Sequence, residues 1–154
     1  MNDQFHFSPS GFELLKRSEG LLLRVGRDRG NPVIGYGHDL TVHEQVSGLF
    51  INGITRDQAD SICQSDVALA ENIVKRLVRV ALTQGQFDAL VDFVFNLGVV
   101  KFEGSTLLRD LNAGQYEAAA EQLQRWDHEG DVEVAGLKAR RQQEFNLWHG
   151  KPAQ

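Results

Sequence analysis

The feature that most constrains the fold is an almost uninterrupted apolar segment between residues 87 and 95. Its large side chains cover most of the circumference of a helix, so other elements must surround that helix. Thr83 is the predicted N-cap, and Asn96-Leu97-Gly98 is the predicted end. We therefore predict a central core helix in this segment. Its apolar side chains are Phe87, Leu90, Val91, Val94 and Phe95.

Amphipathic segments on both sides of this core predict further helices. The longest covers about residues 56–78, with Thr55 as N-cap and Gln58 in the reciprocal capping-box position. A first helix begins with Ser8-Pro9 and runs to about Ser18 or Glu19, where Gly20 ends it. Shorter helices are predicted near 105–111, 115–125 and 136–148. The long helix has one apolar stripe, which consists of Ala59, Ile62, Cys63, Val67, Ala70, Ile73, Val74 and Leu77.

The region between the first two helices has a different pattern. Residues 21–25 form a short strand-like run, residues 27–32 are polar and turn-like, and residues 33–37 alternate as a second strand. Residues 39–53 have no clear period and are predicted as a loop, in part compatible with a helix. The fold class is therefore α+β and mostly helical, and 154 residues correspond to one domain, 1–154. We expect a small β-lobe over about 20–50 and a helical lobe over 8–19 and 55–150.

Composition excludes several classes of protein. No apolar run reaches the roughly 18 residues of a membrane helix, and residues 1–10 lack the pattern of a secretory signal. We therefore expect a protein made in the cytoplasm, with no membrane partner. A formal net charge of −5 argues against nucleic acid. Cys63, the single cysteine, is interpreted as a small core residue, and Trp126 and Trp148 as core side chains. No metal-ligand spacing is present, and no cofactor or metal is expected.

Two carboxylates stand in unlike surroundings near the first turn of the β region. Glu19 shares a helix face with Phe12 and Leu15, whereas Asp28 lies in the polar turn. Glycoside hydrolysis commonly uses such a pair, a buried group that stays protonated as the acid and an exposed group that stays ionised. By spacing alone, a glutamate at a helix end is more often a solvated or structurally paired group. The pair is therefore a hypothesis that needs further support.

The surrounding motifs supply that support. Ser18-Glu19-Gly20, Arg27-Asp28 and Ile34-Gly35-Tyr36-Gly37-His38 resemble the active-site signature of the phage lysozyme family, glycoside hydrolase family 24. The resemblance extends over about residues 8–150. Its further motifs are Asn52-Gly53-Ile54-Thr55, Leu82-Thr83-Gln84, Gln86 to Leu90, Phe95 to Gly98, Ser105 to Leu108, Asn112-Ala113-Gly114, Arg125-Trp126, Gly136-Leu137, Arg140-Arg141 and Leu147-Trp148.

The resemblance implies a lysozyme-like two-lobed fold with a long interlobe helix and a sugar polymer bound between the lobes. The implied substrate is the β-1,4 bond between N-acetylmuramic acid and N-acetylglucosamine in bacterial peptidoglycan. Glu19 matches the general acid and Asp28 the second carboxylate, which helps to place water and stabilises developing positive charge. The implied setting is a monomeric endolysin that reaches the periplasmic cell wall through a holin-type pore or another route of delivery.

The resemblance also implies roles for residues around the two carboxylates. His38 matches a structural histidine that pairs with an aspartate of the long helix, for which Asp66 is the best candidate. Asn96 matches a position that contacts sugar, and Tyr36 is a second candidate for substrate binding, although it could equally belong to the core. Arg140 or Arg141 is implied to approach Glu19.

The sequence departs from the family pattern in the turn after Asp28, which is one residue shorter than usual, and at two further positions. Val33 stands where the family has a catalytic-site threonine, whose hydroxyl helps to hold the attacking water, and Gly26 replaces the usual tyrosine before Arg27-Asp28. Valine cannot make that hydrogen bond. Asn31 and Thr41 are close enough in sequence to supply a substitute. Two hypotheses therefore stand: an active muramidase, or a lysozyme-fold binding or regulatory module with weak or no catalysis. A different glycan substrate or a transglycosylase outcome also remains open.

Overall fold

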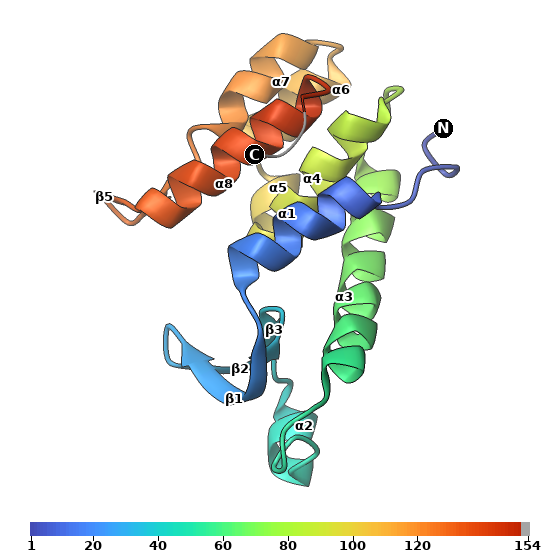
Figure 1. Ribbon diagram of the computed structural model, residues 1–154. Helices are drawn as coiled ribbons and strands as arrows, with labels where there is room; N and C mark the ends of the chain where they lie inside the picture. The colour runs from blue at the N-terminus through green and yellow to red at the C-terminus, as the bar shows by residue number, and fades with distance from the viewer. Residues whose placement is uncertain (152–154) are drawn as a thin grey trace. The chain divides into compact units, whose positions relative to one another are not determined.

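The computed structural model describes residues 1–151, and its chain divides into two compact units. One unit consists of Met1–Leu14 and Leu69–Gln154, and the other of Leu15–Ala68. Two helices, α1 (Pro9–Glu19) and α3 (Arg56–Leu77), each begin in one unit and end in the other (Figure 1). Among the described residues, no helix is long and apolar enough to cross a membrane.

The unit of residues 15–68 contains a three-stranded antiparallel sheet in the order β1 (Leu22–Asp28), β2 (Asn31–Gly35) and β3 (His38–Asp39). The predicted turn over 27–32 is shorter in the structure, because only Arg29 and Gly30 connect β1 to β2. Their φ angles of 50° and 85° are those of a two-residue hairpin turn whose twist suits the flanking strands. Strand β3 was not predicted, because two residues have no readable period.

The stretch predicted as a loop over 39–53 contains a short helix, α2 (Val42–Ser47). Thr41 caps it, and Glu44 completes a capping box by accepting from the Thr41 backbone N–H at 2.8 Å. None of its residues is buried, so no apolar period marks it in the sequence. The next helix, α3, begins after the predicted cap, where Thr55 and Gln58 exchange hydrogen bonds of 2.8 and 3.2 Å.

The other unit is helical and is built around α4 (Gln84–Leu97), the predicted core helix. Its residues 87–94 are all buried, including Asp88 and Asp92, two carboxylates inside the apolar segment. Thr83 caps the helix with Gln86, as expected, and α8 (Ala135–Trp148) packs against it. The remaining elements are α5 (Val99–Glu103), α6 (Thr106–Asn112), α7 (Tyr116–Leu123), β4 (His128–Glu129) and β5 (Val132–Glu133).

Three of these elements were not predicted. Helix α5 follows α4 directly after Gly98 and has only five residues, and β4 and β5 form a hairpin of two-residue strands where the sequence indicated a turn. Helical and strand periods cannot be recognised over so few positions. The predicted core assignments of Trp148 and Cys63 are confirmed, since both are buried. Burial raises the pKa of the Cys63 thiol to about 11, which leaves it an inert core residue.

Candidate active site

Glu19 is the last residue of α1 and belongs to the unit of residues 15–68. It is half-buried. Leu15, one turn earlier on the same face, is fully buried. The Glu19 carboxyl lies directly against Gly37: a Cβ atom placed on Gly37 would be 2.3 Å from Glu19 Oε2. The helix end and the turn before β3 therefore set the position of this carboxyl together.

Asp28 is the last residue of β1 and is exposed, directly opposite Asn31 across the hairpin. The turn beside it is braced by Arg27, whose Nη1 donates to the Gly30 carbonyl at 2.8 Å. Glu19 and Asp28 thus lie in unlike surroundings, one half-buried at a helix end and one open to solvent at a strand end. This is the arrangement that acid catalysis by a carboxyl pair uses.

Val33 occupies the central strand of the sheet, with Gly26 opposite on β1 and Asp39 opposite on β3. Its side chain is only 5% exposed. Of the two residues considered as substitutes for a threonine hydroxyl, Thr41 is engaged as the cap of α2, where it donates to Glu44 Oε2 at 2.9 Å. Asn31, exposed and opposite Asp28, is the better placed substitute.

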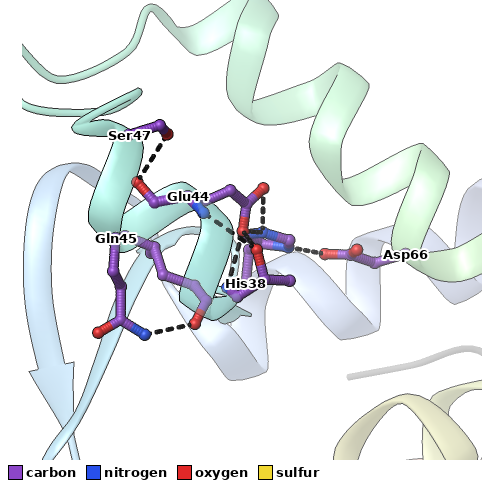
Figure 2. Close-up of polar contacts among 7 residues, drawn as sticks. His38, Glu44, Gln45, Ser47 and Asp66 are labelled. Carbon is purple, nitrogen blue, oxygen red and sulfur yellow. Dashed lines mark hydrogen bonds and ion pairs between the residues drawn. The ribbon is translucent and has the colours of Figure 1, made fainter.

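His38 links three elements of its unit (Figure 2). Its Nδ1 lies 2.7 Å from Asp66 Oδ2 on α3, the contact that the family resemblance implied, and its Nε2 lies 3.2 Å from Glu44 Oε2 on α2. The hydrogen bond to Asp66 is the main reason that the pKa of His38 rises to about 9. The imidazole is therefore protonated at neutral pH and holds two carboxylates, as a structural ion pair would.

Sequence analysis overlooked Glu44 as a partner of His38. A signal was present, because Thr41-x-x-Glu44 is a capping-box pattern. This pattern predicts the start of α2 and a glutamate side chain that turns back toward the Thr41 N–H. The same carboxylate accepts from the Thr41 backbone, from the Thr41 hydroxyl and from His38. One side chain thereby stabilises the helix start and anchors the helix to the sheet.

Tyr36 is 7% exposed and lies beneath the Lys16 ammonium, whose Nζ is 5.0 Å from the ring centroid. Lys16 in turn pairs with Asp60 on α3 at 2.6 Å, and this hydrogen bond raises the pKa of Lys16. The ammonium therefore covers one face of the ring. A role of Tyr36 in binding substrate stays a prediction, and the structure adds a role in fixing the turn that follows β2.

The other candidate residues belong to the helical unit, where they form a buried charged network. Arg140 donates twice to Asp92, from Nε at 2.8 Å and from Nη2 at 2.9 Å. Arg141 donates to Glu144 at 2.6 Å and to Asn96 Oδ1 at 3.0 Å. The contact with Arg141 directs the Asn96 carbonyl toward the arginine, so the Asn96 N–H groups are the atoms available to a ligand. The predicted approach of an arginine to Glu19 stays a prediction.

Two carboxyl groups of this network were missed by sequence analysis, and their pKa values are shifted in opposite directions. Arg140 and the surrounding hydrogen bonds lower the pKa of Asp92, whereas burial raises the pKa of Glu144 well above its usual value. Both side chains are 0% exposed. Each carboxyl group is held by an arginine, since Asp92 accepts from Arg140 and Glu144 accepts from Arg141. Asp92 could have been noticed as an acidic residue inside an apolar helix, and Glu144 by its helical spacing from both arginines.

The structure thus distributes the predicted site over both units. Glu19, Asp28, Val33, Tyr36, His38 and Asp66 belong to the unit of residues 15–68, and Asn96, Arg140 and Arg141 belong to the helical unit. Within the described part of the chain, no group of three or more histidine, cysteine or acidic side chains could hold a metal ion. The carboxyl groups of Glu19 and Asp28 are of a type that can transfer protons and stabilise charge.

A small antiparallel sheet, a long helix and a helical unit, in this order and with these carboxylates, define a lysozyme-type protein. The solved muramidase domain of SpmX from Asticaccaulis excentricus has the same fold, with a TM-score of 0.81 and 34% identity over 94% of this chain and 98% of that one.

The chain belongs to the phage lysozyme family, which matches residues 16–144. It is 38% identical to the endolysin of Salmonella phage P22 over 91% of this chain and 97% of that protein. It is 36% identical to the endolysin of Acyrthosiphon pisum secondary endosymbiont phage 1, over 93% of this chain and 97% of that one. The predicted family and the predicted α+β, mostly helical lysozyme-like fold are confirmed. Family and fold are those of glycoside hydrolases that act on peptidoglycan.

Proposed function

We propose that this protein is a muramidase that hydrolyses the β-1,4 bond between N-acetylmuramic acid and N-acetylglucosamine in peptidoglycan. One observation carries the proposal: the Glu19 carboxyl is half-buried at the end of α1, while Asp28 in the same unit stands exposed at the end of β1. Glycoside hydrolysis commonly uses two carboxyl groups in unlike positions, one to donate a proton and one to stabilise charge and orient water.

In this mechanism Glu19 donates its proton to the glycosidic oxygen as the bond between that oxygen and the anomeric carbon breaks. The electron pair of the bond goes to the leaving oxygen, and positive charge develops on the sugar ring. Asp28, ionised, stabilises this charge and orients the incoming water. Asn96 is proposed to bind sugar through its N–H groups. The cell wall is the proposed place of action, reached through a holin-type pore or another route.

The decisive experiment is mass analysis of the products after purified peptidoglycan is incubated with the wild-type protein and with Glu19→Gln. We expect muropeptides with new reducing ends at N-acetylmuramic acid from the wild type and none above background from the variant. Glu13→Gln, at an exposed position of the same helix, is the matched control and should digest like the wild type. Equal background rates for wild type and Glu19→Gln would contradict the proposal. Anhydro-sugar products would instead identify a transglycosylase.

Val33 favours a second candidate, a lysozyme-fold module that binds glycan or protein with little or no turnover. Its buried apolar side chain stands where a threonine hydroxyl is expected to hold water. This candidate predicts that the wild-type protein sediments with insoluble peptidoglycan without releasing soluble fragments. Release of reducing ends by the wild type, absent from Glu19→Gln, would rule it out.

A further inference from the structure

Gly37 lies directly against the side chain of Glu19, a contact that no sequence pattern indicated. A Cβ on this residue would lie 2.3 Å from Glu19 Oε2, 2.8 Å from Cδ and 3.3 Å from Cγ. Real Cβ atoms essentially never come closer than 3.0 Å to a heavy atom of this kind. Only a residue without a side chain is compatible with the Glu19 carboxyl in its present position.

Two separate structural features, the backbone conformation and a close contact, favour glycine at position 37. Its φ of +71° belongs to the left-handed region, which disfavours other residues, and it also makes the close approach. Gly35 shares only the left-handed backbone conformation, with a φ of +64°. A Cβ added there would have its nearest contacts at an ordinary 3.7 Å. Gly20 has a φ of +70° with open space around it. The close contact with Glu19 is therefore not a consequence of the backbone conformation.

The residues on either side of Gly37 are anchored. Tyr36 is buried beneath the Lys16 ammonium, and His38 is paired through both ring nitrogens, with Asp66 at 2.7 Å and Glu44 at 3.2 Å. A methyl group added at Gly37 would be attached to a turn that is held in place and would contact the far end of the flexible Glu19 side chain. The carboxyl of Glu19, and not the turn, would have to move.

We propose that Gly37 is a positioning residue for the acid: its bare Cα is the seat of the Glu19 carboxyl, and the cation–π contact of Tyr36 with Lys16 and the ion pairs of His38 keep that seat in place. The inference rests on the proposed role of Glu19 as proton donor. Displacement of a reacting group by about 1 Å is enough to lower a rate by up to about a hundredfold. These contacts then serve catalysis indirectly, by holding the turn that carries Gly37.

The test compares Gly37→Ala with Gly35→Ala, which shares the positive φ but does not approach Glu19. We expect both variants to fold with a melting temperature lowered by a few degrees, because alanine is strained at either position. Gly37→Ala is expected to lose about tenfold or more of the peptidoglycan-hydrolysing activity, with a changed pH profile of the remaining activity. Gly35→Ala should retain most of the activity and the wild-type profile.

A second measurement does not depend on turnover. In a Glu19→Ala background the clash is removed, so the loss of melting temperature caused by Gly37→Ala should shrink to that caused by Gly35→Ala. If the loss is the same with and without Glu19, and Gly37→Ala is as active as Gly35→Ala, the seat does not exist. If the wild type is inactive, the proposed function fails, and the melting temperatures alone decide for or against the seat.

Discussion

Gly26 and Val33 face each other across the β1–β2 ladder. The family resemblance predicts a tyrosine and a threonine at these two positions, so the two expected departures form one cross-strand pair. Because directly opposite residues share a face of a sheet, a change at one alters the surroundings of the other.

Replacing Val33 by threonine tests whether this pair limits catalysis. If the missing hydroxyl limits turnover, Val33→Thr should raise the rate of peptidoglycan hydrolysis about tenfold or more, since one polar group at a transition state contributes a few kcal/mol. The folded state should lose about 1–2 kcal/mol, because a hydroxyl enters a buried apolar position. Val33→Ala removes bulk without adding a hydroxyl and should not gain activity. Equal rates for the two variants would show that Val33 is not the limiting change.

The pairing of His38 predicts how stability depends on pH. Because the folded-state pKa is raised from 6.5 to about 9, protonated His38 contributes stability that is fully present below about pH 6.5 and is lost as the pH rises through about 9. We expect His38→Gln to lose about 1–3 kcal/mol at pH 7, allowing for partial solvent screening. The measurement is chemical unfolding between pH 6 and 10.

The control for this prediction is His43→Gln, at an exposed position of α2. This variant should retain the wild-type dependence on pH, whereas the difference between wild type and His38→Gln should shrink towards pH 10. A constant difference over the whole range would show that His38 is not charged in the folded state.

The buried pair of Asp92 and Glu144 predicts opposite responses to two similar substitutions. Glu144→Gln should cost little, since a raised pKa favours the neutral form that glutamine resembles, whereas Asp92→Asn should cost about 3–5 kcal/mol by removing the carboxylate that accepts two hydrogen bonds from the buried Arg140. Because the folded-state pKa of Glu144 is raised, its contribution to stability falls as the pH rises above the unfolded value. Glu144→Gln should flatten that fall in unfolding experiments between pH 4 and 8. Equal costs for both substitutions would contradict the opposite directions of the two pKa shifts.

A pair of glycines at equivalent helical positions tests the packing of α4 against α8. Gly85 and Gly136 are each the second residue of their helix, but a Cβ at Gly85 would lie 2.1 Å from the Leu147 carbonyl oxygen, whereas one at Gly136 meets nothing within 4 Å. Gly85→Ala should destabilise the protein by about 1–3 kcal/mol, and Gly136→Ala should stabilise it by up to about 1 kcal/mol. Thermal unfolding of both variants checks this, and a stabilising Gly85→Ala would refute the close approach.

Prediction from sequence succeeded where long periods or specific caps mark an element. The core helix, its cap at Thr83 and the long helix with its cap at Thr55 were all expected, and of the predicted stripe Ala59, Cys63 and Val67 are among the buried members. It did not find α5, β3 or the β4–β5 hairpin, because two to five residues have no period. It also extended the first turn too far, since the strands continue to Asp28 and from Asn31.

The sequence by itself determined the family and the mostly helical fold, because these depend on local motifs and on the spacing of apolar residues. Only the tertiary structure decided which groups meet: Glu44 with His38, Asp92 with Arg140, Gly26 with Val33, and the Glu19 carboxyl with Gly37. Each of these contacts joins different elements of the chain. A contact of this kind is set by how helices and strands pack, which no local pattern encodes.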